Sequence, residues 1–345
     1  MKNSAFFSIV FVFIISSLCS IDAFAYPKHR HDAVSSQSTS NASSSLHENM
    51  SSSQQISFST HQSVDTDAIE KQDKTKTCAG LPCIDLVPLV DDVYYTVTEP
   101  HQTVAQQAAK WGIASNVLTI LNTGLKENTV LTPGQKILVE ARMSSEPVPY
   151  SSGKANRGRI RNARLMPEGE GYFLRNIRTH EWGTNITIQS LMTAFHLYAE
   201  QYPDGPAINL GDISKRRGGK ASPHKSHQSG RDVDIGFVHT PEATLKAKQH
   251  FTRADEENLD IEKTWFFIKT LIQTGNVQQI YVDTTVQKLL WTAAREELTP
   301  EQRDIIFSWP HRSTSSSAIF QFWPGHRNHF HVRFKCPPNQ PGCHK

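Results

Sequence analysis

The stretch SPHKSHQSGRDVDIGF, residues 222–237, combines a polar loop and a strand in a short space. Its second half, DVDIGF, alternates polar and apolar residues, which predicts a β-strand with Asp232 and Asp234 on one face. Gly230 permits a tight turn into that strand, so His224 and His227 are expected on the preceding loop. Loop histidines and a strand aspartate can converge on one metal ion from this spacing. Taken alone, the stretch is equally compatible with a solvated surface loop.

A second histidine cluster, WPGHRNHFHVRF at residues 323–334, favours the metal site. The run HFHVRF predicts another strand, on which His329 and His331 point the same way, about 7 Å apart, while Phe330 and Val332 face the core. One of these two histidines can ligate a metal ion while its neighbour meets the water bound there. His326 precedes them in the same cluster.

Histidine and aspartate donors of this kind are a ligand set suited to zinc. Three protein ligands leave a fourth position open for water, which is the mark of a catalytic site. Zinc lowers the pKa of that water, and a nearby histidine can take its proton. A structural zinc site would more often use cysteines. The two clusters therefore predict a catalytic zinc centre.

The residues around the two strands predict an α+β domain. Helical periodicity marks three segments, and two further runs have the character of strands. The helices are expected over residues 187–202, 264–273 and 286–298, and the strands over 278–283 and 317–324. In the first helix Ile188, Leu191, Phe195 and Tyr198 share one face. Because strands and helices do not alternate as βαβ units, the sheet is expected to be mainly antiparallel.

The N-terminal residues have the pattern of an exported protein. Residues 1–25 combine a positive Lys2, an apolar run and a small-x-small cleavage site, which predicts a secretory signal peptide. Cys19 raises the alternative of a lipoprotein, but Leu18 before it is large for a lipobox. Residues 26–93 are predicted to be a Ser-rich, disordered spacer, since the stretch to residue 76 has few large apolar side chains. We expect a location in the periplasm or outside the cell.

Residues 94–140 predict a small βααβ unit. Thr103 and Gly112 bracket a first short helix, Ser115 is the expected cap of a second, and LTPGQKILVE forms a turn and a strand. These residues resemble a lysin-motif (LysM) domain, a family that binds the N-acetylglucosamine backbone of peptidoglycan or chitin. The chain departs from the family at residues 100–104, PHQTV, where the family has Gly-Asp-Thr-Leu. The alternative is a spacer domain without a sugar ligand.

The remaining boundaries follow from charge and cysteines. Residues 141–163 lack apolar periodicity and carry several arginines, which predicts a basic linker; a catalytic domain is expected over 164–337 and a short tail over 338–345. Export predicts that the four cysteines after Cys19 form disulfides. The local pairs Cys78–Cys83 and Cys336–Cys343 are preferred, with a cross-link between the two ends as the alternative.

The stretches RTHEWGT, GDISKRRGGKASPHKSHQSGRDVDIGF and WPGHRNHFHVRFKCP together resemble the penicillin-insensitive murein endopeptidases. These are secreted zinc peptidases of the lysostaphin and D-Ala-D-Ala metallopeptidase group, and they cleave the D-Ala–diaminopimelate cross-link of peptidoglycan. The resemblance implies that His227, Asp234 and His331 are zinc ligands and that His329 is the general base. It places His224 and His326 at the family's additional histidine positions, where they line the site or touch the metal.

Several alternatives remain open from the sequence. Basic residues at 215–217, 220, 225 and 231 are candidates to hold substrate carboxylates, although most such charges are simply solvated. A non-enzymatic wall-binding relic predicts the loss of a ligand or base, yet none is missing from the pattern. An amidase, a carboxypeptidase or an enzyme for L,D-cross-links would use the same scaffold. A formal net charge of +3 calls for no nucleic-acid partner, and no stretch after the leader has the length of a membrane span.

Overall fold

The computed structural model describes residues 76–175, 178–246, 250–310 and 317–345. Seven helices and five β-sheets lie within these residues. None of these helices has the length and apolar character needed to span a bilayer. The predicted signal peptide and most of the predicted spacer lie outside the described residues.

A six-stranded sheet carries the two histidine-rich segments. Its strands, in spatial order, are β13 (Phe320–Phe322), β12 (Val277–Val282), β14 (His329–Phe334), β11 (Asp232–Gly236), β10 (Ile208–Leu210) and β8 (Tyr172–Leu174). The three central pairings are antiparallel, and the pairing at each edge is parallel. The expectation of an α+β fold with a mainly antiparallel sheet is confirmed for this part of the chain.

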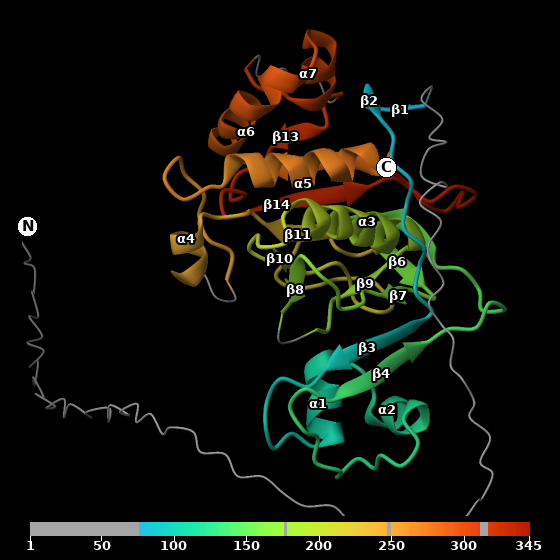
Figure 1. Ribbon diagram of the computed structural model, residues 1–345. Helices are drawn as coiled ribbons and strands as arrows, with labels where there is room; N and C mark the ends of the chain where they lie inside the picture. Colours follow the sequence, from blue (N-terminus) through green and yellow to red (C-terminus); the bar gives the residue numbers. More distant parts are fainter. Residues whose placement is uncertain (1–75, 176–177, 247–249, 311–316) are drawn as a thin grey trace, which may run out of the picture. The chain divides into compact units, whose positions relative to one another are not determined.

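The apolar face of the sheet is covered by two helices, α3 (Asn185–Gln201) and α5 (Ile261–Gln273). They lie side by side in Figure 1, and the rings of Phe195 and Phe267, one from each helix, are 4.8 Å apart. Phe330 of β14 packs against Phe267 and is 1% exposed. The alternation predicted for the strand is therefore correct, since its apolar residues enter the core and leave the other face to polar side chains.

Three more helices complete this part of the fold: α4 (Pro241–Lys246), α6 (Thr284–Glu297) and α7 (Pro300–Ile306). The helix α7 has no counterpart among the sequence expectations. Its signal was present, because Thr299 and Gln302 form a reciprocal capping box around a proline at the first helical position.

The unit predicted for residues 94–140 is a two-stranded sheet with two helices, namely β3 (Asp92–Thr96), α1 (Val104–Trp111), α2 (Ser115–Leu121) and β4 (Lys136–Ala141). Thr103 caps α1 and Gly112 ends it in a left-handed conformation, both as predicted. The prediction that Ser115 caps α2 is wrong. Ala114 is the cap residue, and the Ser115 hydroxyl donates to Glu127 instead.

Part of the predicted basic linker is a β-hairpin, formed by β5 (Tyr150–Lys154) and β6 (Arg157–Arg161). Buried side chains fix it to the rest of the fold, because the Ser151 hydroxyl donates to the Ser229 carbonyl and Ile160 is 1% exposed. Two short strands that follow the hairpin in the chain, β7 (Arg164–Leu165) and β9 (Trp182–Gly183), pair with each other. In β6 three arginines alternate with a glycine and a buried isoleucine, which is a strand pattern. The high content of arginine in this segment led to the linker prediction instead.

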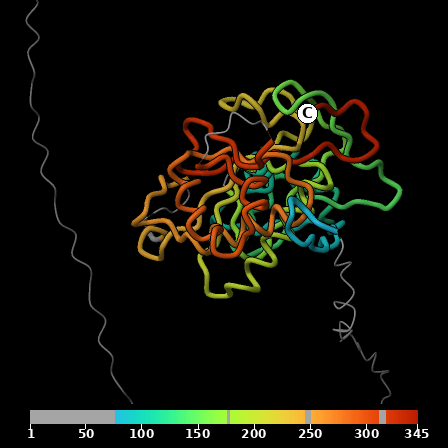
Figure 2. Tube along the Cα trace, turned by 90° about the horizontal axis from the view of Figure 1, so that it is seen from above, coloured from blue at the N-terminus to red at the C-terminus, as the bar shows by residue number. Residues whose placement is uncertain are grey.

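Both preferred disulfides are present: Cys78 is bonded to Cys83, and Cys336 to Cys343. The first joins Cys78 of β1 (Thr77–Cys78) to Cys83, the residue after β2 (Leu81–Pro82), inside the range expected to be spacer. The second joins the end of the expected catalytic domain to the segment expected to be a tail. That segment also bonds to the hairpin, since His344 donates its amide to the Gly153 carbonyl. Figure 2 shows the C-terminus beside the green loops of this region.

Candidate metal centre and active site

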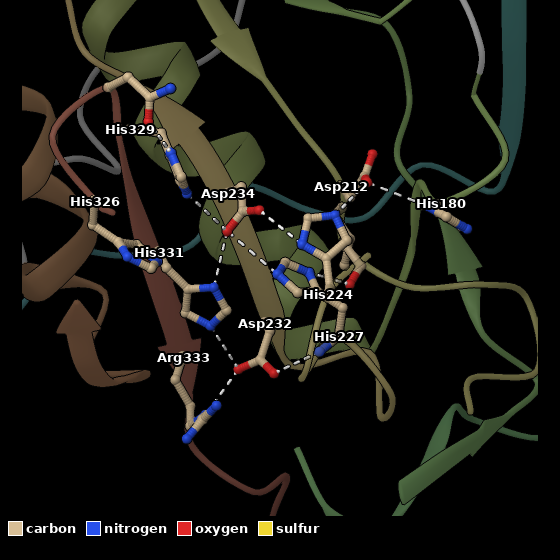
Figure 3. A network of polar contacts seen from close by, with 12 residues as sticks. His180, Asp212, His224, His227, Asp232, Asp234, His326, His329, His331 and Arg333 are labelled. Atoms are coloured by element: carbon tan, nitrogen blue, oxygen red, sulfur yellow. Dashed lines mark hydrogen bonds and ion pairs between the residues drawn. The ribbon is translucent and has the colours of Figure 1, made fainter. Parts of the chain in front are cut away.

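The polar face of the sheet brings the predicted site residues together through strand register. In the antiparallel pair β11–β14, Asp234 lies opposite His331, Asp232 opposite Arg333, and Gly236 opposite His329. Tyr281 of β12 lies opposite His331 on the other side. Two strands nearly a hundred residues apart thus place a carboxylate and an imidazole face to face, as Figure 3 shows.

Three imidazoles converge on the Asp234 carboxylate. His331 Nδ1 lies 2.9 Å and His227 Nε2 3.3 Å from Oδ1, and His224 Nδ1 lies 3.4 Å from Oδ2. The ligand atoms of His224, His227 and Asp234 are all within 4.8 Å of one another. Asp234 is 3% exposed. Although burial disfavours its charge, His227 and His331 hold the pKa of this carboxyl well below its usual range.

The His227 ring is held in one orientation by its surroundings. Its Nδ1 lies 3.0 Å from the Ile213 carbonyl oxygen, so Nδ1 carries the proton and Nε2 is left as a ligand atom. The backbone N–H of His227 donates to Asp232 Oδ2 at 3.0 Å, and its φ is 63°, a region that non-glycine residues seldom occupy. Such strain is characteristic of functional sites, where the surroundings enforce it.

His331 is held from its other side by Asp232. Its Nε2 lies 3.3 Å from Asp232 Oδ1, to which Arg333 Nε also donates at 2.8 Å. Burial disfavours a charged His331 ring, yet the two carboxylates raise its pKa to about 9. His331 therefore binds a second ring proton, which a metal ion at this ring would displace. Asp232, held by Arg333, is placed to orient the ring.

His224 belongs to a second chain of contacts around Asp212. Its Nε2 lies 2.8 Å from Asp212 Oδ2, and His180 Nδ1 lies 3.3 Å from the same oxygen. Burial opposes the charge of Asp212, but its hydrogen bonds to these two histidines keep its pKa below the usual range. The hydrogen bond to Asp212 in turn raises the pKa of His224. Asp212 is thus placed to orient the His224 ring.

His329 and His326 lie beside the converging group without joining it closely. His329 Nε2 is 3.7 Å from Asp234 Oδ1, and its Nδ1 is 2.7 Å from the Asn328 side-chain oxygen. The Phe251 ring stacks on His329 at 4.8 Å, with 16° between the planes. Burial lowers the pKa of His329 to about 4, so its ring is neutral near pH 7 and can accept a proton. The His326 ring is 4.7 Å from that of His329, and burial lowers its pKa as well.

The model of the penicillin-insensitive murein endopeptidase family matches residues 151–345, more than half of the chain. The chain belongs to this family.

Curated relatives with the same name agree with this membership. The protein of Haemophilus influenzae is 29% identical over 247 residues, which cover 65% of this chain and 78% of the relative. The protein of a Yersinia pestis strain is 26% identical, covering 61% of this chain and 74% of the relative. The family match begins in the β5–β6 hairpin and runs to residue 345, so it includes residues 151–163 of the predicted linker and the whole of the predicted tail.

The six residues singled out from the sequence lie together in this family member, with five histidines around Asp234: His224, His227, His326, His329 and His331. Sequence reasoning missed four residues around them. Phe251 and Asn328 contact His329, whereas His180 contacts Asp212 and Arg333 contacts Asp232. His180 stands in the stretch RTHEWGT, and Arg333 follows the strand alternation from His331, so both had a signal. Phe251 had none, since it lies in a segment without periodicity.

Arg231, one of the basic residues suggested for substrate carboxylates, has another role. Its side chain is 0% exposed and donates to the carbonyl oxygens of Phe334 and His344. It therefore fastens the C-terminal segment to β11 and is closed to substrate.

A cavity of about 950 Å³ opens next to the histidine cluster. Asn328 and Phe251 line one part of it, His180 and Asp212 another, and Arg175 and Tyr172 a third. It thereby connects the surroundings of His329 with those of His224.

Proposed function

We propose that this chain is a zinc-dependent endopeptidase that hydrolyses the D-Ala–diaminopimelate cross-link of peptidoglycan. Membership of the murein endopeptidase family and the names of the curated relatives support a murein endopeptidase. The observation that carries the zinc part of the proposal is the convergence of His227, His331 and His224 on the buried Asp234 carboxylate.

The residues present fit a zinc ion by the chemistry of their donor atoms. His227 Nε2, the Asp234 carboxylate and His331 Nδ1 would hold it, and His224 lies close enough to be a further ligand. When bound, zinc supplies a Lewis acid that makes a water nucleophilic near neutral pH and polarises the amide carbonyl. Ile213, Asp232 and Asp212 orient the three imidazoles from behind.

His329 is proposed to be the general base. Its low pKa keeps the ring unprotonated, and its Nε2 faces the Asp234 carboxylate while Asn328 holds Nδ1. The ring would accept a proton from the attacking water and, now protonated, could donate that proton to the leaving amine. His326, next to it, is proposed to line the site and support the negative charge that develops on the substrate oxygen.

Peptidoglycan is proposed as the partner of the whole chain. The unit at residues 92–141 has the element order expected of a lysin motif, which supports binding to the glycan strand. Two disulfides fit a protein that works outside the cytoplasm, in the periplasm or at the cell wall.

Metal content tests the ligand assignment independently of activity. We expect about one zinc ion per chain in the purified protein by elemental mass spectrometry, and a rise in Tm when zinc is returned to chelator-treated protein. Both results are expected to disappear in Asp234→Asn and to survive in Asp204→Asn, a change at an exposed carboxylate. Full zinc retention in Asp234→Asn would refute the assignment.

Purified muropeptide dimers test the bond that is cleaved. One dimer carries the D-Ala–diaminopimelate link and a second carries a link between two diaminopimelates; products are identified by mass. We expect cleavage of the first dimer alone, with the glycan–peptide amide left intact. Preference for the second dimer would establish an L,D-type specificity, and release of free peptide from sugar would establish an amidase.

A further inference from the structure

The cavity beside the histidine cluster has a cationic side chain on its wall. Arg175 lies just after β8, and its guanidinium carbon is 4.7 Å above the centre of the Phe251 ring. The Phe251 ring also stacks on His329, at 4.8 Å between the ring centres. Arg175 and His329 thus share Phe251 as a neighbour, which places Arg175 within one ring of the proposed base.

The charge of Arg175 is incompletely compensated. Its NH1 is 3.6 Å from Asp212 Oδ1, beyond an ordinary hydrogen bond. Asp212 is also closer to other partners, since its Oδ2 lies 2.8 Å from His224 and 3.3 Å from His180. The Arg175 side chain is 34% exposed and lines the cavity.

The second arginine of the cavity differs in this respect. Arg178 NH1 donates to Glu168 Oε1 at 2.5 Å, and its guanidinium lies 4.4 Å above the Tyr95 ring. Its side chain is 9% exposed. Of the two arginines that line the cavity, Arg175 is therefore the one with capacity for an anion.

The substrate proposed above offers such an anion. The diaminopimelate carbon that carries the scissile amide nitrogen also carries a carboxyl group, so a negative charge lies within a few bonds of the bond to be broken. A guanidinium presents paired N–H donors that match a carboxylate. We propose that Arg175 binds this carboxylate and so selects cross-links with a free acid over those in which the carboxyl is amidated. This inference rests on the proposed endopeptidase function.

The test uses two cross-linked dimers that differ only in this carboxyl, one with the free acid and one with the carboxamide. Steady-state kinetics of the full-length protein and of Arg175→Gln are compared on both. We expect the wild type to prefer the acid by roughly 10- to 100-fold in kcat/KM, the usual value of a charge-assisted hydrogen bond. In Arg175→Gln this preference is expected to vanish, mainly through KM on the acid.

Two further variants make the result specific. Arg175→Lys retains the positive charge but lacks the paired N–H donors of the guanidinium, and it is expected to keep part of the preference for the acid. Arg295→Gln, at an exposed arginine on α6, is expected to leave both substrates unaffected.

Three outcomes overturn the inference. An equal loss on both dimers would mean that Arg175 acts through Asp212 on the histidines, and equal wild-type rates on both dimers would mean that the carboxyl is not sensed. Failure of the wild type to cleave either dimer would refute the proposed function itself, and the inference with it.

Discussion

The Asp212 carboxylate shows how a residue outside the proposed ligand set can control it. One of its oxygens lies within 3.3 Å of both His180 and His224, and the other lies 3.6 Å from Arg175. Partners of this kind fix the tautomer and the direction of a ligating ring. The activity of the site should therefore depend on the Asp212 carboxylate, even though its partners are His180, His224 and Arg175 and not the side chains of the assigned triad.

Asp212→Asn is expected to lower kcat by roughly 10- to 100-fold, the usual cost of losing a carboxylate that orients a metal-site histidine. Zinc content should remain near one per chain, because His227, Asp234 and His331 are untouched. The rates are measured on a cross-linked dimer and the metal by elemental analysis, with Asp204→Asn as the control. An unchanged kcat would exclude the orienting role.

Glu181 presents a titratable group in an unusual setting. Its side chain is 0% exposed, and neither carboxylate oxygen has a hydrogen-bond partner among the described residues. Burial, reinforced by the charge of Asp212, raises its pKa well above the ordinary value of 4.5. The folded state therefore binds the Glu181 proton more tightly than the unfolded state does.

The sign of the pH effect follows from this raised pKa. The stability that protonated Glu181 contributes is complete below the unfolded pKa and is lost as pH rises from about 4.5 through the folded pKa. Glu181→Gln should remove the loss, so the difference in unfolding free energy between the two proteins should change by up to about 1.4 kcal/mol per pH unit in that window. Urea unfolding at pH 5, 6 and 7 measures it; parallel profiles would contradict the burial argument.

At the scale of elements, the turn into β11 depends on a close approach by the β5–β6 hairpin. Gly230 has a φ of 72°, and a Cβ at this position would lie 2.4 Å from Ile160 Cδ1 of β6 and 3.3 Å from Gly183 Cα. The loop that holds His224 and His227 is thus set against a strand from the segment expected to be a linker.

Gly230→Ala is expected to destabilise the fold by about 1–3 kcal/mol more than Gly219→Ala. Gly219 has a similar φ of 77° but open space around its Cα, so the comparison removes the cost of the backbone conformation. The two unfolding free energies are obtained by urea denaturation. Equal losses would mean that the hairpin adapts freely and does not support the loop.

The elements also show what the sequence can predict. Alternation in DVDIGF and HFHVRF predicted both site strands and their polar faces, since one face of each strand must be buried. The hairpin at 150–161 was missed because its contacts are distant in the chain, to Ser229 and to the C-terminal segment, and its own residues are mostly charged or small. Ser115 was misjudged because Glu127 competes for its hydroxyl.

At the scale of the whole molecule, the unit at residues 92–141 is bonded to the family domain. The Tyr95 hydroxyl donates to the Met166 carbonyl at 2.8 Å, and Thr96 donates both its amide and its hydroxyl to Glu168. Glu168 also pairs with Arg178, which lines the cavity. A movement of this unit would therefore shift Glu168 and Arg178 in the cavity wall, although the unit lies outside the family match.

We propose that the cluster around Asp234 holds zinc and cleaves cross-links in the wall. Digestion of purified sacculi tests it most directly, with the protein untreated, chelator-treated, and chelator-treated with zinc returned, and with His331→Ala alongside. Muropeptides are then quantified by liquid chromatography and mass spectrometry. We predict that D-Ala–diaminopimelate dimers are converted to monomers, that the chelator and His331→Ala each stop this conversion, and that zinc restores it in the wild type alone. Dimers that stay intact with the untreated protein, or conversion that persists with the chelator or in His331→Ala, would refute zinc-dependent cleavage by this cluster.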